Sequence, residues 1–120
     1  MSAYNTVTDV PATCPQCQAK VSVGVQFKFG ATWQYRYILG DALHWGSNDI
    51  GTPGHERVVA DGAADSSCPA CGYEGDWDFY VFIERDRIVR VTQADGTHDF
   101  VRAGRSYLDL GSDPGSVPRR

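Results

Sequence analysis

Two short stretches decide the fold of this chain, Cys14-Pro15-Gln16-Cys17 and Cys68-Pro69-Ala70-Cys71, and we call them the first and second knuckle. Together they hold all four cysteines of the sequence. A Cys-x-x-Cys pair turns tightly enough to direct two thiolates at one ion, and two such pairs complete the tetrahedron of sulfurs found in structural zinc sites. We therefore expect the four thiolates to bind one structural Zn²⁺ ion per chain.

The residues around the cysteines suit tight turns. Pro15 and Pro69 fix φ at the start of each turn and remove an N–H group that would need a partner. Gly72 suits a position with positive φ, which lets backbone N–H groups turn toward the sulfurs. Gln18 holds the matching place in the first knuckle and is less suited to it, so we expect the first knuckle to be the less ideal of the two.

This arrangement resembles the zinc-ribbon group, whose hallmark is a pair of Cys-Pro-x-Cys knuckles on β-hairpins. The residues that match the hallmark are Cys14, Cys17, Cys68 and Cys71. The resemblance covers only the knuckles and their flanks; it implies a structural zinc site and leaves the function open, because zinc ribbons serve many unrelated tasks. Residues 18–67 separate the two pairs, which is longer than the usual spacing of about 15–20 residues. We interpret the excess as an inserted β-hairpin and loop.

Three other uses of the four cysteines stay open. Iron in a rubredoxin-like site uses the same four sulfurs, and residues 68–73 look rubredoxin-like locally. Disulfides within each pair would need an oxidising compartment. A thioredoxin-like redox pair would open a helix, whereas neither knuckle is followed by a helical period.

Length and composition indicate one small domain. The 120 residues include 13 glycines and 6 prolines, which favour turns over helices. We expect a mainly β fold, with antiparallel hairpins joined by the four-cysteine site, over residues 1–110, and a flexible tail over residues 111–120. The sequence shows no export signal and no apolar run of the about 20 residues that span a membrane, so we expect a cytoplasmic protein.

Period-two alternation predicts the first strands. Residues 4–10 alternate weakly and predict a short edge strand. Residues 20–29 alternate clearly, and their apolar face consists of Val21, Val23, Val25, Phe27 and Phe29. Residues 32–39 alternate as well, and we predict that they pair with residues 20–29 in an antiparallel hairpin with an aromatic face. Most of these aromatic side chains are expected in the core, and the alternative is an exposed platform.

A second set of strands is predicted around and after the second knuckle. Residues 57–61 predict a short strand. Residues 77–84 carry aromatic side chains on both faces, which indicates a central strand covered on both sides. The chain then turns at Arg85-Asp86 and returns over residues 87–92. Residues 98–110 fit either a last pair of strands or a short helix.

Residues 40–56 follow neither period and form a long loop, and long loops are often functional or mobile. The candidate binding residues of this loop are His44, Trp45 and His55. Together with Asp41, Asp49 and Glu56, the two histidines are candidates for a second polar site. The alternative is a solvated loop that its tryptophan pins to the domain.

Catalysis has little support in the sequence. A site filled by four cysteines is closed, so it does not activate water. His44 with Asp41 or Glu56 is the only candidate acid–base group, and a small enzyme built on His44 and His55 is the weakest of three hypotheses. We expect a non-enzymatic protein.

Binding of nucleic acid is the second hypothesis. Residues 85–120 carry seven Lys/Arg and five Asp/Glu, whereas residues 1–84 carry four and ten. A basic stripe is predicted from Arg85, Arg87, Arg90, Arg102 and Arg105. The overall charge of −4 and the acidic residues after the second knuckle oppose phosphate binding. The leading hypothesis is therefore a small binding or accessory module that recognises a protein partner or small ligand through the aromatic hairpins and the 40–56 loop.

Overall fold

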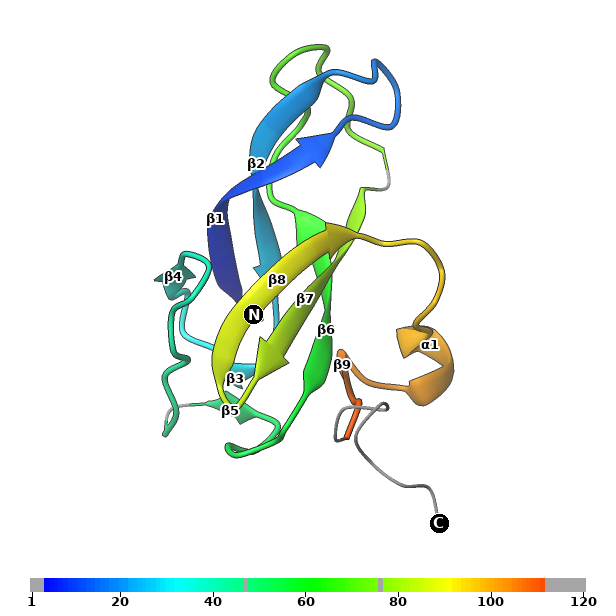
Figure 1. The fold of residues 1–120 in the computed structure, drawn as a ribbon. Helices are drawn as coiled ribbons and strands as arrows, with labels where there is room; N and C mark the ends of the chain where they lie inside the picture. Colours follow the sequence, from blue (N-terminus) through cyan, green and yellow to red (C-terminus); the bar gives the residue numbers. More distant parts are fainter. Residues whose placement is uncertain (1–3, 47, 76, 112–120) are drawn as a thin grey trace.

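A computed structural model describes residues 4–46, 48–75 and 77–111, and it has the mainly β fold that the sequence predicts (Figure 1). The described part measures 47 × 33 × 27 Å along its principal axes. Its elements are β1 (Asn5–Thr13), β2 (Lys20–Phe27), β3 (Gly30–Ala31), β4 (Arg36–Tyr37), β5 (Asp49–Ile50), β6 (Val58–Ala64), β7 (Asp78–Glu84), β8 (Arg87–Gln93), α1 (Phe100–Ala103) and β9 (Tyr107–Asp109).

One curled sheet contains seven strands in the order β4-β1-β2-β6-β7-β8, with β9 added beside β6. β3 and β5 form a separate two-stranded sheet. Within the large sheet only the β1–β4 pair is parallel. β6 joins the parts of the sheet, because one of its edges pairs with β7 and the other is shared by β2 and β9.

The sheet curls until its two ends approach each other. At one end, the Gln93 side chain accepts a hydrogen bond from the Thr13 N–H (2.7 Å) and donates one to the Thr13 carbonyl (2.9 Å). At the other end, the chain that leaves β4 runs along β8, where the Gly40 N–H donates to the Ile88 carbonyl at 2.7 Å. The outer edges of β1 and β8 are thus partly covered, which limits pairing with other chains.

The inside of the curl holds the hydrophobic core. The predicted apolar face of residues 20–29 is confirmed, because its members from Val23 to Phe29 are buried. In β7, Phe79, Val81 and Ile83 are buried on the inner face, and Tyr80 is buried on the outer face. The predicted central position of the strand is confirmed, whereas its outer face is covered at Tyr80 only, since Asp78 and Glu84 are exposed.

The predicted hairpin at residues 85–86 is also confirmed. β7 and β8 pair antiparallel, and Arg85 (φ 48°) and Asp86 (φ 68°) connect them. Two residues with positive φ are typical of the type I′ turn, whose twist matches that of the adjoining strands. Of the two alternatives considered for residues 98–110, the chain forms the short helix α1; the predicted pair of strands is wrong, because the strand β9 that follows pairs with β6.

The predicted hairpin between residues 20–29 and 32–39 is wrong. β2 already pairs with β1 on one edge and with β6 on the other, so neither edge is free for the following segment. The chain turns away at Gly30 (φ 82°) and returns as β4 on the far side of β1. The buried Asn5 fixes this crossing: its Nδ2 donates to the carbonyls of Phe29 (3.3 Å) and Ala31 (3.0 Å), and its Oδ1 accepts from the Tyr35 N–H (3.1 Å).

The predicted edge strand over residues 4–10 is longer and more central than expected. β1 continues to Thr13 and has partners on both sides. Its register with β2 shifts between Val7 and Val10, around Asp9 with φ 58°. The extra residue of this bulge changes which side chains face inward, so the alternation read from the sequence did not hold along the strand.

Two other expectations concern the C-terminal tail and segments that could span a membrane. Of the predicted tail at 111–120, only Gly111 belongs to the described residues. Within those residues, no helix has the length and hydrophobicity needed to cross a membrane.

Candidate metal centre

The two knuckles lie at the tips of two hairpins. The first knuckle connects β1 to β2, and the second connects β6 to β7. Because β2 pairs with β6, the two tips lie together at one end of the molecule, at the top of Figure 1. The sheet therefore brings together cysteines that are more than fifty residues apart in the sequence.

The four sulfur atoms form one cluster. The Sγ atoms of Cys14 and Cys71 are 3.7 Å apart, those of Cys17 and Cys68 are 3.9 Å apart, and all four lie within 4.8 Å of one another. A tetrahedron with metal–sulfur bonds of about 2.3 Å has sulfur–sulfur edges of about 3.8 Å. A disulfide would need about 2.05 Å, and all four cysteines are free. The spacing fits four ligands around one metal ion.

Both knuckles use the same backbone geometry. The Gln18 N–H donates to the Cys14 carbonyl at 3.1 Å, and the Gly72 N–H donates to the Cys68 carbonyl at 2.8 Å. The two residues that end these turns have positive φ, 65° at Gln18 and 80° at Gly72. The predicted correspondence of these positions is confirmed, and glutamine occupies a conformation that favours glycine.

Backbone N–H groups point at the sulfurs, as they do where a thiolate is stabilised. The N–H groups of Gln16 and Cys17 lie 3.3 and 3.4 Å from the Cys14 Sγ, and the Ala70 N–H lies 3.3 Å from the Cys68 Sγ. Cys14 and Cys68 are buried, whereas the second cysteine of each knuckle is exposed. Each knuckle thus supplies one ligand from inside the domain and one from its surface.

The close sulfurs shift one another's protonation. Desolvation raises the pKa of the Cys14 thiol, but hydrogen bonds from backbone N–H groups and from the thiols of the second knuckle outweigh it and lower this pKa to about 6. A backbone hydrogen bond from Tyr73 lowers the pKa of Cys71, but desolvation and the other three thiols outweigh that effect and raise it to about 12. Four sulfurs this close do not all ionise by themselves, because neighbouring thiolates repel one another. A cation that replaced their protons would remove this repulsion.

The site is closed in its chemistry. Among the described residues, these cysteines are the only group of three or more His, Cys, Asp or Glu side chains whose ligand atoms lie together. Four thiolates complete a tetrahedral shell, so the arrangement is that of a structural site, without a position for substrate or water. The fold and the cluster together define a small, mainly β protein with a four-cysteine cluster that fits a metal ion. Comparisons with protein-family models, curated proteins and solved structures found no match.

The histidines of the 40–56 loop have separate partners and do not form one polar site. The His44 ring stacks on Tyr35, with centroids 4.2 Å apart and planes at 24°, and the His44 N–H donates to the Tyr37 hydroxyl. Trp45 packs edge-on against the buried Phe29 at 5.4 Å. This contact matches the alternative in which the tryptophan pins the loop.

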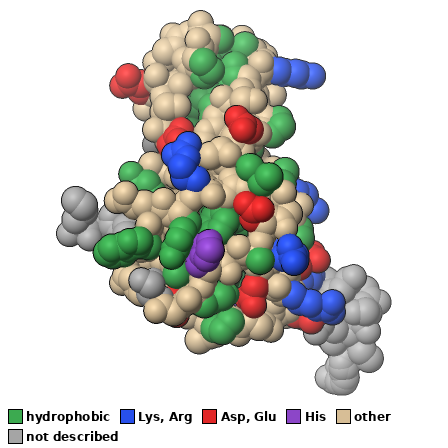
Figure 2. Space-filling view, turned by 90° about the vertical axis from the view of Figure 1, so that its left-hand side faces the viewer, with side chains coloured by type: hydrophobic (Ala, Val, Ile, Leu, Met, Phe, Trp, Pro, Cys, Tyr) green, Lys and Arg blue, Asp and Glu red, His purple; other side chains and the backbone are tan. Residues whose placement is uncertain are grey.

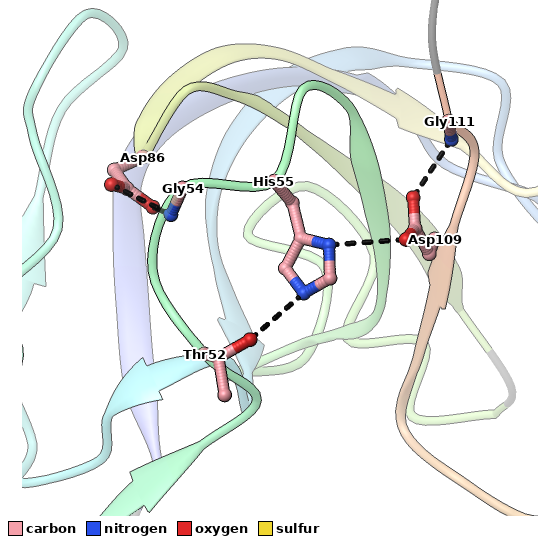
Figure 3. A network of polar contacts seen from close by, with 6 residues as sticks. All are labelled: Thr52, Gly54, His55, Asp86, Asp109 and Gly111. Carbon is pink, nitrogen blue, oxygen red and sulfur yellow. Dashed lines mark hydrogen bonds and ion pairs between the residues drawn. The ribbon is translucent and has the colours of Figure 1, made fainter.

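His55 belongs to a different network, which Figure 3 shows from close by. Its Nε2 lies 3.1 Å from the Thr52 hydroxyl, and its Nδ1 lies 3.1 Å from a carboxylate oxygen of Asp109 in β9. Sequence reasoning missed Asp109, because no local pattern links β9 to the loop 54 residues earlier. The order hydroxyl–imidazole–carboxylate occurs in hydrolases; here the imidazole joins Thr52 of the loop to Asp109 of β9. We read the network as a clamp between the loop and β9.

The five predicted arginines have different surroundings, and two of them, Arg85 and Arg87, line one hollow. The Arg85 guanidinium is 2.6 Å from a carboxylate oxygen of Glu56, and Arg87 donates to the Gly40 carbonyl at 2.9 Å. Arg90 and Arg105 lie over aromatic rings, and Arg102 is in the last turn of α1. Four of these side chains, those of Arg85, Arg87, Arg90 and Arg105, thus have different local partners.

Proposed function

We propose that this chain is a small, zinc-stapled binding domain without catalytic activity, and that it recognises a protein partner. The choice of zinc is supported by the closed set of four thiolates, the usual shell of structural zinc. Iron uses the same donors in rubredoxin-like sites, so elemental analysis of purified protein is the direct test. We expect about one zinc per chain; a stoichiometric iron content with visible absorbance would contradict this part of the proposal.

The observation that carries the partner assignment is the exposed apolar surface of residues 33–39, which include β4. Trp33, Ile38 and Leu39 are 64%, 56% and 48% exposed. Because Gly40 bonds to Ile88, this segment runs beside the exposed Val89 of β8. Figure 2 shows the face of the molecule that carries β4, where hydrophobic side chains lie side by side and flank a histidine. Exposed tryptophan and aliphatic side chains are typical anchors of protein interfaces.

Two observations favour a protein partner over nucleic acid or a substrate. Two of the five arginines of the predicted stripe, Arg85 and Arg87, already contact a carboxylate and a carbonyl oxygen within the domain. A phosphate backbone is bound best by a continuous row of cations. The closed metal site leaves no open position for catalysis.

Affinity capture with three forms of the zinc-loaded protein tests the surface. The first is the unchanged chain, the second carries Trp33→Ser, Ile38→Ser and Leu39→Ser, and the third carries Val101→Ser, which removes a 93%-exposed side chain on α1. We expect the first and third forms to retain one partner protein and the second form to lose it. Once purified, this partner should bind the first and third forms with similar affinity and the second form more weakly. Equal retention by all three forms would refute this surface.

A salt series separates the nucleic-acid hypothesis. We expect weak or absent binding of a single-stranded oligonucleotide at all salt concentrations. Tight binding whose affinity falls steeply with rising salt would instead indicate phosphate contacts.

A further inference from the structure

A hollow of about 530 Å³ lies on the outer face of β7 and β8. Its volume falls within the range of small-ligand sites, roughly 300–1,000 Å³. Arg57, Phe82, Arg90, His98 and Leu110 are among its lining residues. The hollow thus combines two cations with an aromatic and apolar wall.

Arg90 is held in place by an aromatic ring and not by an acceptor. It is the cross-strand partner of Phe82, and its guanidinium carbon lies 4.2 Å from the centroid of that ring. Within the described part of the chain, the guanidinium makes no hydrogen bond or ion pair. Stacking fixes the plane of the guanidinium and leaves its N–H donors directed sideways, where they can bind a carboxylate or phosphate with two parallel hydrogen bonds.

The other cation of the hollow is also weakly engaged. The Nε of Arg57 is 4.0 Å from a carboxylate oxygen of Glu84, which is the outer limit of an ion pair, and Glu84 is about half exposed. The hollow has one lining carboxylate, Asp95, whose Oδ1 accepts the N–H of Thr97 in its own turn. Two arginines therefore face the hollow against one carboxylate that is bound to its own loop.

Ring contacts and a hydrogen bond hold the aromatic wall together. Tyr80 and Phe82 lie edge to face with centroids 6.2 Å apart, and the His98 ring stands edge-on to Tyr80 at 4.8 Å. The His98 N–H donates to the Tyr80 hydroxyl at 3.0 Å, which fixes the turn that carries the histidine. The ring nitrogens of His98 have no hydrogen-bond partner among the described residues. A planar ring would find apolar contact here beside the two cations.

We propose that this hollow binds a small organic anion in which a carboxylate or phosphate is attached to an aromatic ring. The anionic group is held by Arg90 and Arg57, and the ring packs against His98 and Leu110. Charge complementarity selects an anion over a cation, and the aromatic wall selects a ring-bearing anion over an inorganic one. The proposal does not depend on the identity of any protein partner.

The test is a titration of the full, zinc-loaded chain followed by ¹H–¹⁵N NMR. The probes are phenyl phosphate, benzoate, inorganic phosphate and, as the cationic counterpart, benzylamine. We expect saturable shifts of amide signals in β7, β8 and residues 95–98 with one or both ring-bearing anions. Inorganic phosphate should bind several-fold more weakly, and benzylamine should produce no saturable shift. The relative affinities of phenyl phosphate and benzoate identify which anionic group the site prefers.

Variants then assign the residues. Arg90→Gln should weaken binding by about tenfold or more, because it removes a charge-assisted pair of hydrogen bonds. Arg90→Lys keeps the charge without the planar fork and should be intermediate, and Arg57→Gln should also weaken binding. Arg102→Gln changes an exposed arginine outside the hollow and should leave the affinity unchanged.

Three results would overturn the proposal. The first is no saturable shift with either ring-bearing anion at millimolar concentration. The second is an equal loss of affinity in the Arg90 and Arg102 variants, since a general charge effect would explain it. The third is tighter binding, by a large factor, of a single-stranded oligonucleotide than of phenyl phosphate, with Arg90 required for it. This result would assign the hollow to nucleic acid.

Discussion

The two knuckles differ at the residue that follows the second cysteine, and this difference allows a quantitative test of the turn geometry. Gln18 and Gly72 adopt φ of 65° and 80°. A left-handed conformation costs an ordinary L-residue about 1–2 kcal/mol, and glycine avoids that cost. Glycine is also more flexible in the unfolded chain, which offsets about 0.4–1 kcal/mol of the difference.

The magnitudes follow for each knuckle. Gly72→Ala should destabilise the metal-loaded protein by about 1 kcal/mol through φ alone, because a Cβ at Gly72 would meet no atom within 4 Å. Gln18→Gly should stabilise it by about 0.5 kcal/mol, since the only side-chain hydrogen bond lost is an exposed one to the Pro15 carbonyl at 3.3 Å. In a domain of this size, 1 kcal/mol corresponds to a change in Tm of about 4 °C.

The assay is denaturation of each variant at a fixed concentration of free zinc, with zinc content measured to confirm equal loading. The matched control is the exchange variant Gln18→Gly/Gly72→Gln, which should be close to the unchanged chain because the two turns share one backbone geometry. A Gly72→Ala variant as stable as the original, or a destabilised Gln18→Gly variant, would show that positive φ does not govern these turns.

Three further perturbations test the packing around the sheet. Gly62→Ala should cost about 1–3 kcal/mol of stability in denaturant unfolding, because the new Cβ would lie 2.8 Å from a methyl carbon of the buried Val25; an unchanged midpoint would show that β2 and β6 can separate freely. Asn5→Ala should cost about 2–4 kcal/mol in the same measurement, since it leaves buried backbone groups without partners, and a loss below about 0.5 kcal/mol would contradict the role of this side chain in fixing the crossing. Burial, and to a smaller extent the charge of Asp78, raises the pKa of Asp61 above its usual 3.8. The ionised carboxylate is therefore less stable in the folded protein than in the unfolded chain, and the protein loses stability as the pH rises through this raised pKa. Asp61→Asn should therefore raise Tm at pH 7, with the gain vanishing below pH 3.8; a gain independent of pH would point to another cause.

The sequence by itself identified the four cysteines as one candidate metal site. A knuckle is a local structure, so Cys14 and Cys17 can be recognised as a pair of ligands without knowledge of the rest of the fold. The same holds for the turn at Arg85 and Asp86, where two adjacent residues and the alternation around them set the hairpin. The inward face of β2 was also predictable, because a period of two needs only the strand itself.

Only the tertiary structure decided which strands are neighbours. Alternation shows which face of a strand is buried, but it carries no information about the strand that supplies the hydrogen bonds at each edge. The segment at 32–39 was therefore assigned to β2, although β1 and β6 occupy both edges of that strand. Long-range contacts of single polar side chains decided the rest: Asn5 fixes the crossing after Gly30, and Asp109 draws His55 toward β9. Such contacts leave no local pattern, because each depends on two residues that approach only when the sheet has closed.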